Sequence, residues 1–203
     1  MAVKLYFLTL WRNKLLKFTI ENYIKQHNLV IENLNCQEIE NAISLIKKTI
    51  ERGGRVAVCG NGGSAVAASH YITDWNKMVY THTGLKFNGI CLSDNIGLIT
   101  AYSNDLSYNE VFSEQVKNLL NEDDLLITLS GSGNSENVVK ATNVANDMKV
   151  NTLTICGYDG GKLKQVSDNF VWIRSNDMQL CEDAQTVFGH MVMKSLCGER
   201  LFV

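Results

Sequence analysis

Two polar residues four positions apart, His70 and Asp74, follow a glycine- and serine-rich segment in the first half of the chain. In a helix, this spacing places both side chains on one face, one turn apart. An imidazole and a carboxylate placed in this way can bind a divalent metal ion or share acid–base chemistry. A second pair, Glu182 and His190, lies near the C-terminus in a stretch otherwise rich in apolar residues. These four side chains are the candidates for chemistry.

Two glycine- and serine-rich loops each follow directly on an apolar run. The first is Gly60-Asn-Gly-Gly-Ser64, and the second is Ser130-Gly-Ser-Gly-Asn-Ser135. Each pattern predicts a strand, a tight turn and the first turn of a helix, whose unpaired backbone N–H groups attract anions. Glycine lets the backbone approach the anion closely, and serine hydroxyls add donors. The two loops together predict a site for a phosphorylated small molecule at strand ends.

The elements that must position these groups alternate regularly. Five short apolar runs predict strands, at residues 56–59, 89–92, 125–129, 152–156 and 170–173. Helical patterns lie before, between and after them, at residues 11–26, 37–52, 64–77, 95–102, 108–120, 134–148 and 181–201. Strands that are apolar throughout and separated by helices predict an α/β fold. We expect a five-stranded, mainly parallel sheet flanked by helices, a flavodoxin- or Rossmann-like three-layer sandwich with ligands at the carboxyl ends of the strands.

Composition limits the class of protein. The chain has 203 residues, of which 45% are hydrophobic, and a formal net charge of -2. This suits one compact domain at residues 53–203, with residues 1–52 as an N-terminal helical segment that packs on the core and on an oligomer interface. We expect neither a nucleic-acid partner nor a membrane, because there is no surplus of positive charge and no run of ~18 apolar residues. Six cysteines without a C-x-x-C pair indicate reduced thiols in a cytoplasmic protein.

Four motifs in a fixed order carry a family resemblance. They are Cys59-Gly-Asn-Gly-Gly-Ser64 followed by His70; Ser93-Asp94 with Ser103-Asn-Asp105 and Tyr108-Asn-Glu-Val-Phe112; Ser130-Gly-Ser-Gly-Asn-Ser135; and Thr154-Ile-Cys-Gly157 with Asp159-Gly-Gly-Lys162. From about Asn35 to the C-terminus, the chain resembles the SIS (sugar isomerase) domain family. Within that family it is similar to the sedoheptulose 7-phosphate isomerases, also called phosphoheptose isomerases.

The resemblance implies roles for individual residues. His70, Asp74, Glu182 and His190 match positions that bind zinc, one ion per subunit. Asp74 and His190 also match the catalytic acid–base pair that moves protons between C1 and C2 of the sugar. The serines of the second loop would take the phosphate. The substrate-binding positions that the resemblance implies are Asn61, Gly62, Gly63, Ser64, Asp74, Asn104, Asp105, Ser130, Gly131, Ser132, Ser135 and Glu182.

The resemblance also implies an activity and an assembly. The activity is that of a cytoplasmic aldose–ketose isomerase, which converts sedoheptulose 7-phosphate to D-glycero-D-manno-heptose 7-phosphate through an enediol. Its product would supply activated heptose for lipopolysaccharide, capsule or a glycosylated surface layer. The assembly is a homo-oligomer, a tetramer with active sites near subunit interfaces.

Three positions depart from the family pattern. Asp74 stands where the family usually has Glu, Glu182 where it has Gln, and Gly131 where it has Thr or a similar residue. Asp is one methylene shorter than Glu, and a displacement of ~1 Å of a catalytic group can lower a rate about 100-fold. Two imidazoles with two carboxylates suit Zn²⁺ better than two imidazoles with one carboxylate and an amide. We therefore interpret Asp74 and Glu182 as a compensated pair that serves a shifted substrate.

Helix geometry complicates a single zinc site. Eight residues of straight helix rise ~12 Å, so Glu182 and His190 do not easily reach one metal ion from the same helix. Either Glu182 lies before the helix begins, or the two residues serve sites in different subunits.

Three other functions remain open from the sequence. Some SIS relatives bind a replication-initiator protein as homotetramers without catalysis, and the changes at Asp74 and Glu182 permit an isomerase of a different phosphosugar. Gly60 to Ala65 also fits the dinucleotide pattern G-x-G-x-x-A, with Asp94 somewhat far along as the acidic partner. The presence of His70, Asp74 and His190 favours the enzyme.

Overall fold

The structure is a computed structural model that describes residues 2–198, with side chains from residue 15 onward. At its centre lies one sheet of five parallel strands in the order β2-β1-β3-β4-β5. The strands are β1 (Val56–Gly60), β2 (Gly89–Cys91), β3 (Leu125–Ser130), β4 (Asn151–Cys156) and β5 (Asn169–Trp172). The predicted five-stranded sheet is confirmed, and its pairing is parallel at every neighbour.

Helices precede, connect and follow the strands. They are α1 (Ala2–Glu32), α2 (Cys36–Glu51), α3 (Gly62–Asp74), α4 (Tyr80–Thr83), α5 (Ile96–Asp105), α6 (Ser113–Leu119), α7 (Glu136–Asp147), α8 (Gly161–Val166) and α9 (Met178–Cys197). A π turn, Trp75–Val79, joins α3 to α4, and a 3-10 turn, Tyr108–Glu110, precedes α6.

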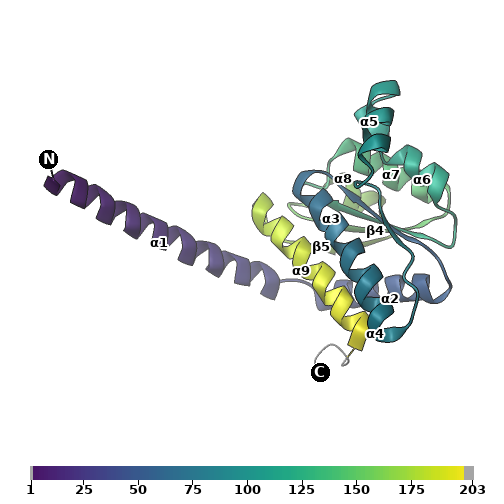
Figure 1. Cartoon of the computed structure of the whole chain (residues 1–203), viewed down its shortest axis with the longest axis horizontal. Coiled ribbons are helices and arrows are strands. Elements are labelled where there is room, and N and C mark those ends of the chain that lie inside the picture. The colour runs from purple at the N-terminus through teal and green to yellow at the C-terminus, as the bar shows by residue number, and fades with distance from the viewer. Residues whose placement is uncertain (1, 199–203) are drawn as a thin grey trace.

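Alternate residues of the buried strands face two different helical layers. In β1, Val56 and Val58 pack into one core with α2, α3 and α9, whereas Ala57 and Cys59 pack into a second core with α6, α7 and α8. Every residue of β1 and β3 is buried, as expected of a parallel sheet covered on both faces. The result is the three-layer sandwich that the sequence predicts (Figure 1).

The strand order places a switch point between β1 and β3. From β1 the chain crosses to β2 on one side, and it then returns to form β3 on the other side. Gly60 at the end of β1 pairs with Leu129 near the end of β3, so the two loops that follow these strands are neighbours. In open α/β sheets, such a point is where ligands bind.

Some predicted helix boundaries are wrong. The helix predicted at residues 64–77 begins earlier and changes to π geometry after Asp74. The helix predicted at residues 108–120 is split into a 3-10 turn and the shorter α6, and the C-terminal helix begins at Met178 rather than at 181. These breaks follow from tertiary contacts, which helical periodicity does not encode.

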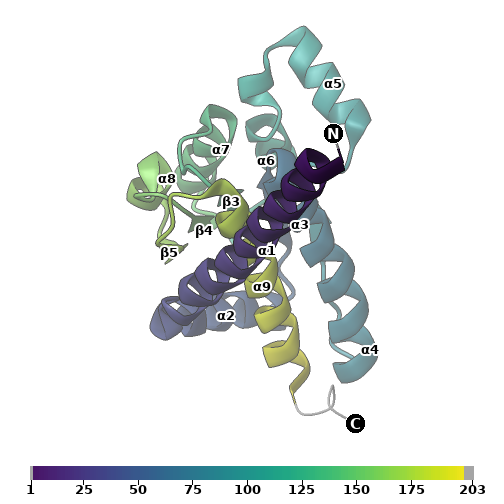
Figure 2. The same cartoon turned by 90° about the vertical axis from the view of Figure 1, so that its left-hand side faces the viewer.

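Helix α1 is longer than the predicted 11–26. No glycine or proline occurs before Gly53, so nothing in the sequence stops this helix early. It projects from the body in Figure 1 and crosses in front of α9 in Figure 2. Within residues 2–198, no helix combines the length and the apolarity needed to cross a membrane.

Candidate active site

A pocket of about 260 Å³ opens at the switch point. It is lined by the two predicted loops and by the first turns of α9: Asn61, Gly62, Gly63, Ser64, Leu129, Ser130, Gly131, Ser132, Ser135, Met178 and Glu182. Nine of the residues predicted to bind substrate are in this set. The other three, Asp74, Asn104 and Asp105, do not line it.

The second loop is braced from behind by the turn that opens α8. Gly133 adopts a φ of 67°, and a Cβ there would overlap the carbonyl group of Gly160, so only glycine fits. The Gly133 carbonyl accepts a hydrogen bond of 3.0 Å from the backbone N–H of Leu163. Inside the loop, the Ser130 hydroxyl accepts one of 3.1 Å from the N–H of Gly133. The turn at residues 159–161 and the start of α8 thus hold the second loop in shape.

Asn61 ties the two loops together. Its side chain exchanges two amide hydrogen bonds with Asn137, of 2.8 and 3.0 Å, and accepts a third of 2.8 Å from the Tyr108 hydroxyl. Asn137 lies in the first turn of α7, directly after the second loop. Asn137 could not be predicted from the sequence, because nothing in its spacing points to Asn61, which is 76 positions away.

Glu182 lies inside α9, over the beginning of α3. A Cβ on Gly63 would overlap the Glu182 carboxyl group, so the carboxylate sits against the first turn of α3. It is the one charged side chain among the described residues that line the pocket. The alternative in which Glu182 precedes the helix is wrong, because α9 begins at Met178, with Asp177 as its N-cap. A helix N-terminus favours a negative charge, and here a protein carboxylate supplies it.

Met178 explains the glycine at position 131. A Cβ on Gly131 would overlap the Met178 sulfur. The thioether therefore occupies the space that a larger side chain would need, and both residues line the pocket.

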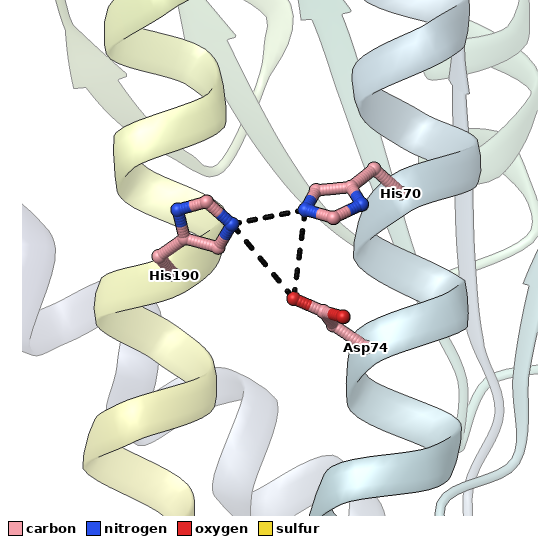
Figure 3. Close-up of side chains that lie close together, drawn as sticks. All are labelled: His70, Asp74 and His190. Atoms are coloured by element: carbon pink, nitrogen blue, oxygen red, sulfur yellow. Dashed lines mark hydrogen bonds and ion pairs between the residues drawn. The ribbon is translucent and has the colours of Figure 1, made fainter.

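His70, Asp74 and His190 converge between α3 and α9 (Figure 3). The Nε2 atoms of the two imidazoles are 2.9 Å apart, and Asp74 Oδ2 lies 3.5 Å from His70 Nε2 and 3.8 Å from His190 Nε2. The side chains are 43%, 26% and 45% exposed for His70, Asp74 and His190, so the group is open to solvent or to another surface. We call these three residues the His–Asp–His group.

The donor set of this group fits a divalent metal ion. Catalytic zinc sites commonly use three protein ligands, such as two imidazoles and a carboxylate, and leave the fourth position open. Zinc–nitrogen bonds of 2.0–2.1 Å in a tetrahedral site place ligand atoms about 3.3 Å apart. The three observed separations, 2.9, 3.5 and 3.8 Å, lie on both sides of that value. The group can therefore hold a metal ion with small side-chain movements.

The structure does not bring every predicted residue to one point. The ligand atoms that lie within 4.8 Å of one another belong to the His–Asp–His group and do not include Glu182. Glu182 and His190 both lie on α9, eight residues apart, with Glu182 at the pocket end. Asn104 and Asp105 end α5, which stands out from the body in Figure 1.

The cysteines do not add a nucleophile to the site. All six are unpaired. Burial raises the pKa of the Cys91 and Cys156 thiols to about 12, so both stay protonated at neutral pH. Chemistry at this site is left to the imidazoles and carboxylates.

Comparisons with known proteins place this architecture in a family. The SIS domain matches residues 22–157. The chain is 35% identical over 191 residues to the phosphoheptose isomerase of Helicobacter pylori (strain ATCC 700392 / 26695), covering 90% of this chain and 97% of that protein. It is also 35% identical over 171 residues to the phosphoheptose isomerase of Aliarcobacter butzleri, covering 84% and 89%.

Solved structures agree at the level of the fold. A phosphoheptose isomerase from Francisella tularensis superposes with a TM-score of 0.82 at 26% identity, covering 88% of this chain and 96% of that one. One from Neisseria gonorrhoeae superposes with a TM-score of 0.83 at 24% identity, covering 89% and 98%. Together with the loops, the switch-point pocket and the extent of the matches, these likenesses show that the chain belongs to the SIS domain family, in the group of the phosphoheptose isomerases.

Proposed function

We propose that this chain is an aldose–ketose isomerase of the phosphoheptose isomerase type, acting on sedoheptulose 7-phosphate. The observation that carries the proposal is that α3 and α9 support two sites at once. Their first turns line the pocket of about 260 Å³, and their later turns bring together the His–Asp–His group. The curated relatives that bear the name phosphoheptose isomerase support the same class.

The phosphate is assigned to the second loop. Ser130, Ser132 and Ser135 line the pocket there with hydroxyl donors, and α7 begins directly after them. The first loop also opens a helix, but the Glu182 carboxylate lies over that helix end. Two negative charges in one place repel each other, so the phosphate binds at the serine loop and the carboxylate faces the hydroxyls of the sugar.

Zinc is proposed as the metal, with His70, Asp74 and His190 as its protein ligands. When bound, it would polarise sugar oxygens and so ease the loss of a proton from the neighbouring carbon. Asp74 Oδ2 faces both imidazoles, whereas Asp74 Oδ1 takes part in neither short contact. The carboxylate can therefore use one oxygen as a ligand and keep the other as a proton acceptor.

Aldose–ketose isomerisation requires proton transfers and no covalent intermediate with the protein. One of Asp74 and His190 removes the proton from the carbon beside the carbonyl and returns it to the adjacent carbon. The other exchanges protons with the hydroxyl and carbonyl oxygens, so that an enediol forms and collapses. Both groups need access to substrate, and the partial exposure of their side chains allows it.

We further propose a homotetramer in the cytoplasm. Large apolar side chains of α1 are exposed in the single chain, including Leu16 at 60% and Phe18 at 67%. Packing against other copies would cover them. Asn104 and Asp105, on the projecting α5, would then serve the pocket of a neighbouring copy. Six unpaired cysteines suit a compartment that keeps thiols reduced.

The test is to incubate the purified protein with sedoheptulose 7-phosphate and to follow aldose formation, with and without a chelator. We expect turnover that falls on chelation and that His190→Gln abolishes, while His27→Gln, on α1 away from the group, retains it. Turnover only with another phosphosugar would replace the substrate assignment. No turnover with any phosphosugar would favour the non-catalytic binding module.

A further inference from the structure

A buried polar seam joins α3 to α9. Trp75 donates its indole N–H to the Gly189 carbonyl at 2.9 Å, and the Tyr71 hydroxyl donates to the Gln185 carbonyl. At the upper end, the Ser64 hydroxyl donates to the Gln185 side-chain oxygen at 2.9 Å. We call these five residues the α3–α9 seam. The two hydroxyl donors lie on α3, the indole donor lies on the π turn that continues it, and all the acceptors lie on α9.

The seam is closely packed. Tyr71, Trp75 and Gln185 have no exposed surface, and the rings of Tyr71 and Trp75 stack with centroids 4.8 Å apart. Gly189 lies against the Tyr71 ring so closely that a Cβ would overlap it.

Three of the five seam residues are sequence neighbours of the members of the His–Asp–His group. Tyr71 follows His70, Trp75 follows Asp74, and Gly189 precedes His190. Successive residues of an α-helix point about 100° apart, so one residue of each pair faces inward and its neighbour faces the groove between the helices. The contacts that fix the inward seam residues therefore also fix how far apart the members of the His–Asp–His group lie, and at which height on the two helices.

The helix also changes form at this place. The π turn begins at Trp75, directly after Asp74. Single π turns inside α-helices are frequent at functional sites. The π turn starts at Trp75, and Trp75 is also the residue whose indole N–H binds the Gly189 carbonyl.

We propose that Tyr71 and Trp75 are positioning residues, which hold α9 at the register that brings His190 to His70 and Asp74 and so build the metal-binding group. The inference rests on the proposed function in that the group is taken as the centre of the reaction. Neither residue needs to touch substrate or metal. The hydrogen bond of Trp75 holds Gly189, the residue next to His190, and that of Tyr71 holds Gln185 four positions earlier on the same helix.

The experiment compares Tyr71→Phe and Trp75→Phe with a matched control, Trp172→Phe. Trp172 also donates its indole N–H to a backbone carbonyl at 2.9 Å, that of Tyr158, but it lies on β5 outside the seam. All three variants lose a hydrogen-bond donor and keep an aromatic ring. Cobalt(II) affinity, the visible spectrum of bound cobalt and unfolding by urea are measured on each purified protein.

We expect each seam variant to remain folded and to bind cobalt at least about tenfold more weakly, the lower end of the range for partners of metal ligands. The visible spectrum should change as well, since it reports the ligand geometry. Trp172→Phe should lose stability to a similar degree, with its cobalt affinity changed by less than about twofold. Rescue of affinity is expected in Trp75→His, which restores a ring N–H.

Three results would overturn the inference. They are unchanged cobalt affinity in both seam variants, an equal loss of affinity in Trp172→Phe, and a wild-type protein that binds no cobalt. Failure of the proposed substrate is a separate outcome. A wild-type protein that turns over no phosphosugar, but whose cobalt affinity falls in the seam variants alone, would retain the positioning role and remove the isomerase.

Discussion

Asp74 has two proposed roles, metal ligand and proton acceptor, and its one carboxylate faces both imidazoles. Its Oδ2 lies 3.5 Å from one Nε2 and 3.8 Å from the other. The sequence predicts this cluster from the i, i+4 spacing of His70 and Asp74 together with the matched position of His190. The neighbouring Tyr71 and Trp75 were not predicted, because their hydrogen-bond partners lie on α9, 114 positions away in the sequence.

Asp74→Asn should impair both the turnover of the enzyme and the metal binding of the His–Asp–His group. The amide keeps the size of the side chain but cannot accept a proton or bind a cation strongly, so we expect turnover to fall by about 100-fold or more and metal affinity to fall with it. Asp74→Glu is the control, because it retains the carboxylate and should keep metal binding. Steady-state kinetics and metal titration check the pair. Asp74→Asn with wild-type turnover would exclude the carboxylate from the proton transfer.

Glu182→Gln should strengthen the binding of the phosphorylated substrate. The change removes the one charged side chain among the described residues of the pocket and keeps its size. Like charges a few ångströms apart cost about 1 kcal/mol in a solvated site, so we expect KM to fall about threefold to tenfold. The difference should shrink at high salt. The control is Glu122→Gln, at an exposed residue outside the pocket, which should leave KM unchanged. An increase in KM for Glu182→Gln would contradict the prediction and show that the carboxylate binds a sugar hydroxyl.

The elements show where sequence patterns were sufficient and where they were not. The strands were predicted well because each is a short, largely apolar run between helical patterns, and β1 and β3 at the centre are buried throughout. Helix ends were predicted poorly where partners outside the helix decide them. The π turn after Asp74 accompanies the hydrogen bond from Trp75 to a carbonyl 114 positions away, and no local pattern contains that partner.

Gly189→Ala tests the closeness of α3 and α9 directly. In an ordinary helix this change stabilises by up to about 1 kcal/mol, but here the new methyl group would overlap the Tyr71 ring. We expect a loss of about 1–3 kcal/mol, as for other overpacked cores, and weaker metal binding. Gly97→Ala, on the exposed face of α5, is the matched control and should change stability by less than about 1 kcal/mol. Urea unfolding decides the sign, and a stabilised Gly189→Ala protein would contradict the close contact.

Tyr23 links α1 to the helix that carries the site. Its hydroxyl donates a 2.6 Å hydrogen bond to Asp183 on α9, and this bond, with the nearby negative charge, raises the pKa of Tyr23 to about 12. Because the folded state holds this proton more tightly, the stabilisation is complete below pH 10 and is lost as the pH rises from 10 towards 12. The tyrosinate absorbance of wild type minus that of Tyr23→Phe should titrate near pH 12. A midpoint near 10 would show that the hydrogen bond does not form.

At the scale of the whole molecule, α1 contacts the body near its C-terminal end, through Tyr23, Val30 and Ile31, and projects from it elsewhere (Figure 1). Its 31 residues of helix extend about 46 Å. The apolar positions Leu16, Ile20 and Ile24 form one stripe, and Leu15 and Phe18 lie to the side of it; all five are exposed by about half or more. A helix that is apolar on more than one face needs more than one neighbour.

This arrangement favours a tetramer over a dimer, because in a bundle each α1 contacts two others. Light scattering of the full chain should give four copies. Leu16→Glu combined with Ile20→Glu places charges in the stripe and should reduce the assembly to dimers or monomers, while Lys17→Ser, at a side chain that is 77% exposed, should leave the tetramer intact. If Asn104 and Asp105 act in a neighbouring copy, the dissociated double variant should also lose turnover while it keeps the His–Asp–His group. A wild-type monomer with full turnover would contradict both the assembly and the shared site.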